Sequence, residues 1–183
     1  MSPTPRTVIP IDKNWKFRLA DKPGLDFAPV AQFPTNIHLD LLANKLIPDP
    51  YIGKNELLVQ WIGESRWVYK TTFSCPPLPG GQTKAVLAFD GLDTFATVEL
   101  NGSKILETDN MFVPERVDVT SEIKEGENQL SITFDNAYLR GWKLVEKYPT
   151  HKWGCWNGDN SRLGVRKAQY HWVGNPTLVR FRG

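Results

Sequence analysis

The feature that most restricts the fold of this chain is an Asn-Gly pair at positions 101 and 102. The run Thr94–Leu100 precedes the pair and Ser103–Leu106 follows it, and both runs have an extended character. Asn and Gly accept the positive φ angles of a type I′ turn, which joins two antiparallel strands through two residues. The sequence therefore predicts a β-hairpin centred on Asn101 and Gly102.

Further short strands are predicted on both sides of this hairpin. A strand is predicted over Ile11–Leu19, where Trp15, Phe17 and Leu19 alternate with basic residues, because a period of two is typical of a half-buried strand. Turn signals recur about every 8–12 residues, a spacing that indicates an all-β sandwich. The other predicted strands are Trp67–Phe73, Ala85–Phe89, Val113–Val119 and Gln129–Phe134.

One or two short helices are predicted among the strands. The run Ile37–Asn44 has a helical pattern, with an N-cap at either Thr35 or Asn36. The proline-rich stretch 47–56 predicts a stiff, shaped surface loop after that helix. A second amphipathic pattern covers Tyr138–Tyr148 and ends at a proline.

Length and charge narrow the class of protein and its partners. A chain of 183 residues suits a single domain over residues 1–183, and its formal net charge is only +2. Because the basic residues form no cluster, nucleic acid is not an expected partner. No apolar run approaches the ~18 residues that a membrane helix needs, and the first residues lack the apolar centre of a secretory signal. We therefore expect a cytoplasmic protein that contacts neither nucleic acid nor membrane.

Cysteine and histidine usage predicts neither a metal nor a cofactor. Cys75 and Cys155 lie far apart in the sequence, so free thiols are the simpler interpretation, although pairing stays open. The three histidines are isolated and have no spacing suited to zinc.

The acidic residues show no catalytic pattern. Asp90 and Asp93 flank a turn, and Glu107 and Asp109 lie at the end of a predicted strand. Acids in such places are commonly turn formers and solvated charges. Nothing in the sequence marks one of them as desolvated, which a general acid at neutral pH would need. No serine has the Gly-x-Ser-x-Gly context of a nucleophile elbow. The sequence therefore assigns no catalytic residue.

Aromatic residues point to a candidate binding segment. The chain contains 7 Trp, and each indole either fills the sandwich core or offers a face for a sugar ring. In the run Arg166–Trp172, basic, amide, phenol, imidazole and indole groups stand side by side, which suits the rim of a polar ligand site. The candidate carbohydrate-binding residues are Trp153, Trp156, Gln169, His171 and Trp172.

The run Arg166–Trp172, Arg-Lys-Ala-Gln-Tyr-His-Trp, resembles a run in β-mannosidases of glycoside hydrolase family 2, of the fungal type. Similar blocks follow the family's order across nearly the whole chain, and the ordered set is much more specific than any single block. The blocks are His38–Leu41 with Ile47–Tyr51, Gly53–Glu56, Trp67–Lys70, Phe89–Thr94, Asn101–Gly102, Asp109–Phe112 and Cys155–Gly158.

The resemblance implies that residues 1–183 are the first domain of such an enzyme, truncated before the catalytic barrel. In the family this domain is a jelly-roll β-sandwich of the galactose-binding-like type. Immunoglobulin-like domains and a (β/α)₈ barrel follow, and the barrel supplies the two glutamates that cleave terminal β-mannosides with retention. The domain itself would then be non-catalytic. Its implied partners are a β-mannoside or manno-oligosaccharide, the barrel, or a second copy of the chain.

The resemblance breaks after Trp172. The family continues into Gly-Trp-Asp-Trp-Gly-Pro, a loop that reaches the active site, whereas here the shorter Val173–Pro176 follows. The sugar-contacting role of the family's loop aspartate is therefore carried over to no residue of this chain. Three functions stay open: weak mannoside binding by the aromatic segment, a structural module that docks on a partner, and a small free-standing glycosidase, which is the least expected.

Overall fold

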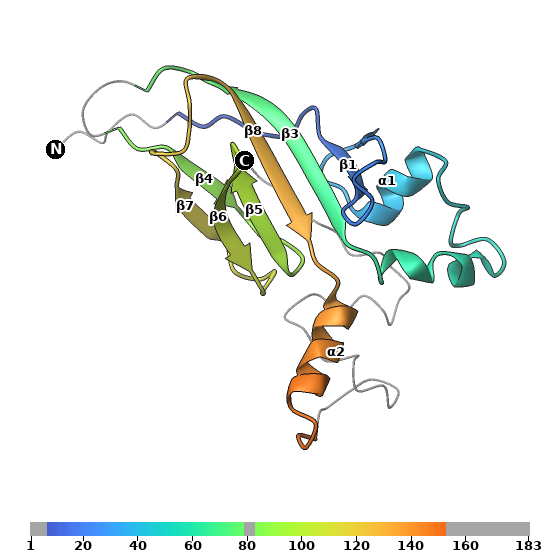
Figure 1. Ribbon diagram of the computed structural model, residues 1–183. Coiled ribbons are helices and arrows are strands. Elements are labelled where there is room, and N and C mark those ends of the chain that lie inside the picture. Colours follow the sequence, from blue (N-terminus) through green and yellow to red (C-terminus); the bar gives the residue numbers. More distant parts are fainter. Residues whose placement is uncertain (1–6, 79–82, 153–183) are drawn as a thin grey trace.

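The computed structural model describes residues 7–78 and 83–152 of the chain and shows a β-sandwich (Figure 1). The described strands are β1 (Lys16–Leu19), β2 (Ala28–Pro29), β3 (Trp67–Cys75), β4 (Val86–Phe89), β5 (Ala96–Leu100), β6 (Ser103–Thr108), β7 (Glu115–Asp118) and β8 (Gly126–Phe134). Six of them form one antiparallel sheet in the order β2-β1-β3-β8-β5-β6, and β4 pairs with β7 in a second sheet. The all-β prediction is confirmed.

The centre of the larger sheet is the long antiparallel pair of β3 and β8. Their register runs from Trp67 opposite Phe134 to Cys75 opposite Gly126. On β3, Trp67, Tyr69 and Thr71 are buried while Val68, Lys70 and Thr72 between and after them are more accessible, as the period of two predicts. The hydrophobic core between the sheets includes Phe17, Leu87, Phe89, Val98, Leu100, Val119, Leu130 and Ile132.

The predicted hairpin forms at Asn101 and Gly102, which have φ angles of 52° and 85°. The Asn101 side chain also joins this turn to neighbouring segments. Its Nδ2 donates to the carbonyl of Glu122 and to Oδ1 of Asn128, both at 2.9 Å, and its Oδ1 accepts from the backbone N–H of Gln129 at 3.0 Å. The positive φ explains the turn, and the side-chain bonds explain why Asn is useful there.

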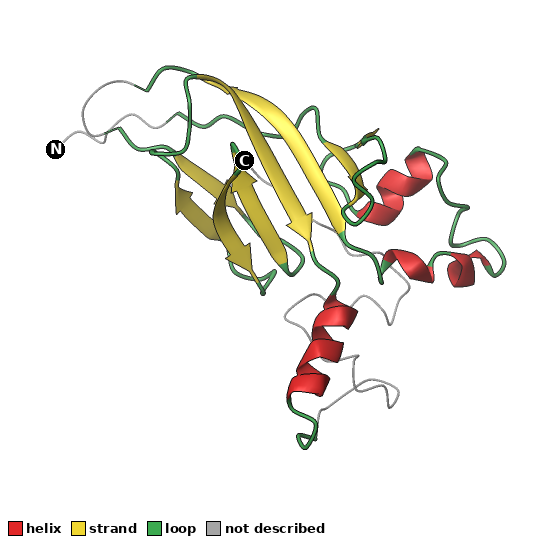
Figure 2. Ribbon diagram, in the orientation of Figure 1, coloured by secondary structure: helices red, strands yellow, loops and turns green. Residues whose placement is uncertain are grey.

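Helices flank the sandwich rather than forming a layer of it, as Figure 2 shows. Helix α1 (Ile37–Ala43) is capped by Asn36, whose Oδ1 accepts from the backbone N–H of Leu39 at 3.1 Å. Of the two residues proposed for this cap, the structure therefore selects Asn36. Helix α2 (Ala137–Lys147) is capped in the same way by Asn136, and it projects from the end of β8 (Figure 1).

Two 3₁₀ helices begin at the end of the proline-rich stretch, η1 (Asn55–Leu58) and η2 (Gln60–Ile62). The sequence predicted a shaped loop over 47–56 and no element over 57–62. The backbone closes short turns instead, such as the bond from the N–H of Leu57 to the carbonyl of Lys54 at 3.1 Å. The segment has no clear helical period because only Val59 and Ile62 are buried in it.

The first strand is shorter than predicted and starts at Lys16 rather than near Ile11. Asn14 has a φ of 60°, which interrupts an extended chain just before the strand. Trp15 nevertheless enters the core, and its indole N–H donates to the carbonyl of Ile11 at 2.9 Å.

Candidate functional site

The polar groups of most interest gather at one end of the larger sheet. A row of backbone partners marks this end, with Trp67 opposite both Leu19 and Phe134, and Ala96 opposite both Phe134 and Thr108. Helix α2 leaves the sheet directly after Phe134, so we call this region the α2 end. The connections before β3 and β5 also arrive here, so segments distant in sequence are brought together.

A cavity of about 180 Å³ opens at the α2 end. Its wall combines aromatic rings with hydroxyl, amide and carboxyl groups. Trp67, Tyr69 and Phe134 come from β3 and β8, and the other residues come from the connections and from the start of α1 and α2. Those other lining residues are Thr35, Asn36, Ile37, His38, Ile62, Gly63, Ser65, Asp93, Thr94, Phe95, Asp135 and Ala137.

Next to this cavity, Asp40 is a buried carboxyl, 1% exposed, on helix α1. Tyr69 donates its hydroxyl to Oδ2 and Thr35 donates its hydroxyl to Oδ1, both at 2.8 Å. Burial raises the pKa of Asp40 to about 6, while the hydrogen bonds from Tyr69, Thr35 and the backbone N–H of Ala31 oppose the rise. Burial, together with the charge of Asp40 and the hydrogen bond to it, raises the pKa of Tyr69 well above its usual value. The phenol therefore remains a donor at neutral pH.

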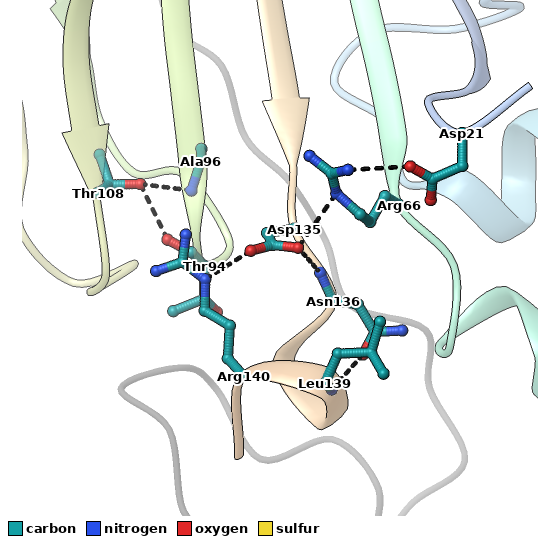
Figure 3. A network of polar contacts seen from close by, with 9 residues as sticks. All are labelled: Asp21, Arg66, Thr94, Ala96, Thr108, Asp135, Asn136, Leu139 and Arg140. Atoms are coloured by element: carbon teal, nitrogen blue, oxygen red, sulfur yellow. Dashed lines mark hydrogen bonds and ion pairs between the residues drawn. The ribbon is translucent and has the colours of Figure 1, made fainter. Parts of the chain in front are cut away.

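Asp135, at the end of β8, has the opposite environment (Figure 3). Arg140 Nε donates to its Oδ2 at 2.7 Å, Arg66 Nε lies 3.3 Å from Oδ1, and the backbone N–H of Asn136 donates to Oδ1 at 2.9 Å. Burial alone would raise the pKa of Asp135, but these hydrogen bonds and the two guanidinium charges lower it overall. Arg66 also bonds Asp21 at 2.9 Å, so the network ties the connection after β1 to the start of α2.

These carboxyl groups do not provide the chemistry of glycoside hydrolysis. A retaining glycosidase places two carboxyl groups about 5 Å apart across the scissile bond and keeps one of them protonated. Asp40 has the raised pKa of a general acid, but both its oxygens accept hydrogen bonds inside the protein. Asp135 is ionised and bound by two arginines. The geometry instead supports a structural role, in which polar bonds fix α1 and α2 against the sheet.

Three of the four acids weighed from the sequence lie where turn formers and surface charges are expected, and the fourth, Asp93, does not. Asp90 bonds Arg116 at 3.2 Å, Glu107 bonds Lys104 at 3.2 Å, and Asp109 is exposed. Asp93 lines the cavity and accepts a hydrogen bond from the hydroxyl of Thr94.

The five candidate carbohydrate-binding residues, Trp153, Trp156, Gln169, His171 and Trp172, all lie outside the described residues and stay predictions. Cys155 also lies outside them, whereas Cys75 is a buried free thiol. Within residues 7–78 and 83–152, no group of His, Cys, Asp and Glu is arranged to hold a metal ion. No helix in the same two ranges is long and apolar enough to span a membrane.

Asp40 and Asp135 were missed by reasoning from sequence. The only signal for Asp135 is its place between a strand and a helix, next to an N-cap Asn. Arg140, five residues later, adds the possibility of a partner one turn along the helix. For Asp40 no local signal exists, because both hydroxyl partners are set by the tertiary fold.

Comparison with known proteins agrees with this fold. Residues 15–176 match the family described as glycosyl hydrolase 2 galactose-binding domain-like. The chain is 70% identical over 177 residues to β-mannosidase B of Thermothelomyces thermophilus. The aligned region covers 96% of this chain but only 21% of that protein. The crystal structure of β-D-mannosidase from Dictyoglomus thermophilum superimposes with a TM-score of 0.77 at 34% identity, over 90% of this chain and 20% of that one.

A more distant structure, exo-chitosanase of Amycolatopsis orientalis, has a TM-score of 0.58 at 21% identity and supports the fold alone. The superimposed region covers 67% of this chain and 16% of the chitosanase chain.

Fold and comparisons together define a galactose-binding-like β-sandwich domain of the kind found in glycosidases. The chain belongs to the glycosyl hydrolase 2 family, and it corresponds to the N-terminal region of its β-mannosidases. It spans about a fifth of the length of the relatives that it matches.

Proposed function

We propose that this chain serves as the non-catalytic N-terminal domain of an enzyme that hydrolyses terminal β-D-mannosides, and that it hydrolyses no glycoside by itself. The observation that carries the proposal is the extent of the match. The alignment with a β-mannosidase covers 96% of this chain, but it covers only 21% of that enzyme. A domain of this kind supports an active site that other parts of the polypeptide complete.

Two carboxyl groups of the described residues support the same proposal. Asp40 combines a raised pKa with complete enclosure, so a glycosidic oxygen has no access to its proton. Asp135 is held in the ionised state by Arg140 and Arg66. Neither residue can exchange a proton with a substrate, which a general acid must do.

The proposal is tested by comparing the chain alone with a chimera. In the chimera, residues 1–172 of this chain replace the matching residues of the Thermothelomyces thermophilus β-mannosidase B, which keeps its own sequence after that point. We expect the chimera to hydrolyse a chromogenic aryl β-mannoside and the chain alone to show no turnover. Turnover by the purified chain that disappears when one of its own aspartates or glutamates is replaced by the corresponding amide would contradict the proposal.

A second candidate function is direct binding of a mannoside by this domain. The cavity at the α2 end favours it, since hydroxyl and amide groups there lie beside the rings of Trp67 and Tyr69. Titration of the chain with mannobiose should then change its tryptophan fluorescence. No change up to tens of millimolar would remove this candidate and leave the first unaffected.

A further inference from the structure

The turn between β5 and β6 lies at the end of the larger sheet opposite the α2 end. Leu100 and Ser103 are paired across it, and the pair Asn101–Gly102 connects them. Asparagine followed by glycine is prone to deamidation, because glycine has no side chain to hinder attack by its own backbone nitrogen. The chain contains this dipeptide at Asn101–Gly102 and again at Asn157–Gly158. The hairpin turn therefore carries a candidate site of chemical modification.

Deamidation at this turn needs only water and base. The backbone nitrogen of Gly102 loses its proton and forms a bond to Cγ of Asn101, while the bond from Cγ to Nδ2 breaks and Nδ2 takes up a proton and leaves as ammonia. Water then opens the resulting cyclic succinimide at either carbonyl, which gives aspartate or isoaspartate. No oxidant or reductant takes part. Gly102 is exposed, so water and hydroxide have access to the turn.

In the folded chain, the amide group of Asn101 is held by three hydrogen bonds. Its Nδ2 donates to the carbonyl of Glu122 and to Oδ1 of Asn128, and its Oδ1 accepts from the N–H of Gln129. Attack on Cγ makes that carbon tetrahedral and expels Nδ2, so the bonds of both amide atoms must break. The backbone N–H of Asn101 also donates to the carbonyl of Gln129 at 2.8 Å, which ties the turn to β8. The turn must therefore open locally before it reacts.

The partner on β8, Asn128, cannot adapt to a changed residue at position 101. Its side chain is buried, and Nδ2 donates to the carbonyls of Lys124 and Gly126 at 2.7 and 3.0 Å. Its Oδ1 accepts from the N–H of Lys124 at 2.8 Å. Turning this amide over would place acceptor against acceptor or donor against donor at all three contacts. Asn128 therefore presents an acceptor, Oδ1, to residue 101.

We propose that Asn101 is a site of one-way deamidation, which the folded turn protects and whose product cannot rebuild the turn. Aspartate at position 101 brings a carboxylate, which has no donor, against the carbonyl oxygen of Glu122 and Oδ1 of Asn128. Isoaspartate adds a methylene to the main chain of a two-residue turn, which disturbs the pairing of Leu100 with Ser103. Chains that have lost the turn therefore accumulate as the protein ages.

The protection is tested by comparing the folded and the unfolded chain. The full chain is incubated in mildly alkaline buffer with and without enough guanidinium chloride to unfold it, and peptide mass spectrometry follows each asparagine. In denaturant, Asn101 and Asn157 should react at comparable rates, since glycine follows both. Without denaturant, Asn101 should react at least about tenfold more slowly than in denaturant, because three bonds of its amide must break. Equal rates at Asn101 in the two conditions would overturn the proposal.

The fate of the product is tested with Asn101→Asp, which reproduces the deamidated residue. It should lower the unfolding temperature by at least about 4 °C near neutral pH. Relative to the parent chain, this loss should shrink in acid, where a protonated carboxyl again offers a donor to Asn128. The matched control is Asn110→Asp, because Oδ1 of Asn110 accepts from the N–H of Phe112 at 3.1 Å and a carboxylate can do the same. The control should shift the unfolding temperature by less than about 2 °C.

Equal stability of Asn101→Asp and Asn110→Asp would refute the second half of the proposal, because the deamidated turn would then form normally. A loss that persists unchanged in acid would refute it as well, since the defect would not be the missing donor. If Asn101→Asp does not fold, the parent chain is partly deamidated in denaturant, refolded and treated briefly with protease. Chains modified at Asn101 should then be digested faster than unmodified ones, and equal survival would contradict the proposal. None of these readouts involves mannoside hydrolysis, so they are independent of the function proposed above.

Discussion

Asp40 and Asp135 both lie at the α2 end, yet their surroundings shift their pKa values in opposite directions. Asp40 is enclosed on α1 with hydroxyl and N–H donors, and its pKa rises to about 6. Asp135 lies between Arg66 and Arg140, and its pKa falls. Burial alone therefore does not set the pKa of a carboxyl group. The charge of the donors decides whether the ionised form is favoured.

The two aspartates also stabilise different connections. Asp40 joins α1 to β3 through Tyr69, whereas Asp135 joins the start of α2 to the chain before β3 through Arg66. Because their pKa values move in opposite directions, the two connections should weaken in different pH ranges.

The largest effect is expected from the titration of Asp40. A raised folded-state pKa means that the fold favours the protonated form. The contribution is therefore complete below the unfolded value near 3.8 and is lost as pH rises through about 6. A shift of about 2 pKa units corresponds to about 3 kcal/mol of unfolding free energy. Urea unfolding between pH 4 and pH 7 should show this loss. Asp40→Asn should flatten the profile, and an unchanged slope in that variant would refute the assignment.

Tyr69→Phe should cost about 2 kcal/mol at pH 7.5, because the ionised Asp40 loses its phenol donor at 2.8 Å in a buried site. Urea unfolding at this pH measures the loss. Thr71→Val serves as a control on the same strand, since its hydroxyl donates to the backbone carbonyl of Lys13 and not to Asp40. If Tyr69→Phe also leaves the pH profile unaltered, the phenol does not act through Asp40.

Asp135→Asn should have a smaller effect, about 1 kcal/mol near neutral pH, because its side chain is 26% exposed and water screens its ion pairs. A lowered folded-state pKa gives stability that is present above the unfolded value near 3.8 and is lost as pH falls through the folded value. Wild type and variant should therefore converge in strongly acidic solution. Divergence there instead would contradict the proposed role of the arginines.

The smallest effect is expected for Arg140→Met, about 0.5 kcal/mol at moderate salt, since the arginine side chain is 42% exposed. Methionine retains apolar contact with Phe95 but removes the charge. In a double-mutant cycle, Arg140→Met and Asp135→Asn should couple, and the coupling should weaken as salt is added. Strictly additive losses would show that the 2.7 Å bond contributes no free energy.

Much of the sandwich was predictable because its strands carry strong local patterns. The period of two at Trp67 and Tyr69 and the Asn-Gly turn at 101–102 both appear as predicted. The local pattern did not predict that Asp40 is buried. Apolar side chains are usually buried and charged ones exposed, and helix α1 reverses this order. Leu39 is 44% exposed while Asp40 beside it is 1% exposed. Only the tertiary partners Tyr69 and Thr35 explain that reversal.

The candidate site was less predictable than the fold. The cavity at the α2 end combines residues from positions 35 to 137, and no local window contains that information. Helices η1 and η2 were missed for a related reason. Leu57 and Leu58 are exposed, so the apolar residues there do not repeat at the spacing of a buried helix face. The aromatic segment from Trp153 to Trp172 was selected from composition and resemblance, and its role in carbohydrate binding stays a prediction.

The hairpin at Asn101 has a consequence for producing the protein. Asn101, Gly102 and Ser103 form an Asn-x-Ser acceptor sequence for N-linked glycosylation. In the folded chain the acceptor nitrogen, Nδ2 of Asn101, already donates to Glu122 and Asn128. Secretory hosts attach glycans while a chain is still being translocated, before these bonds exist. A sugar added then would occupy the nitrogen that locks the turn, so expression inside a bacterial cytosol should give better-folded material than secretion from yeast.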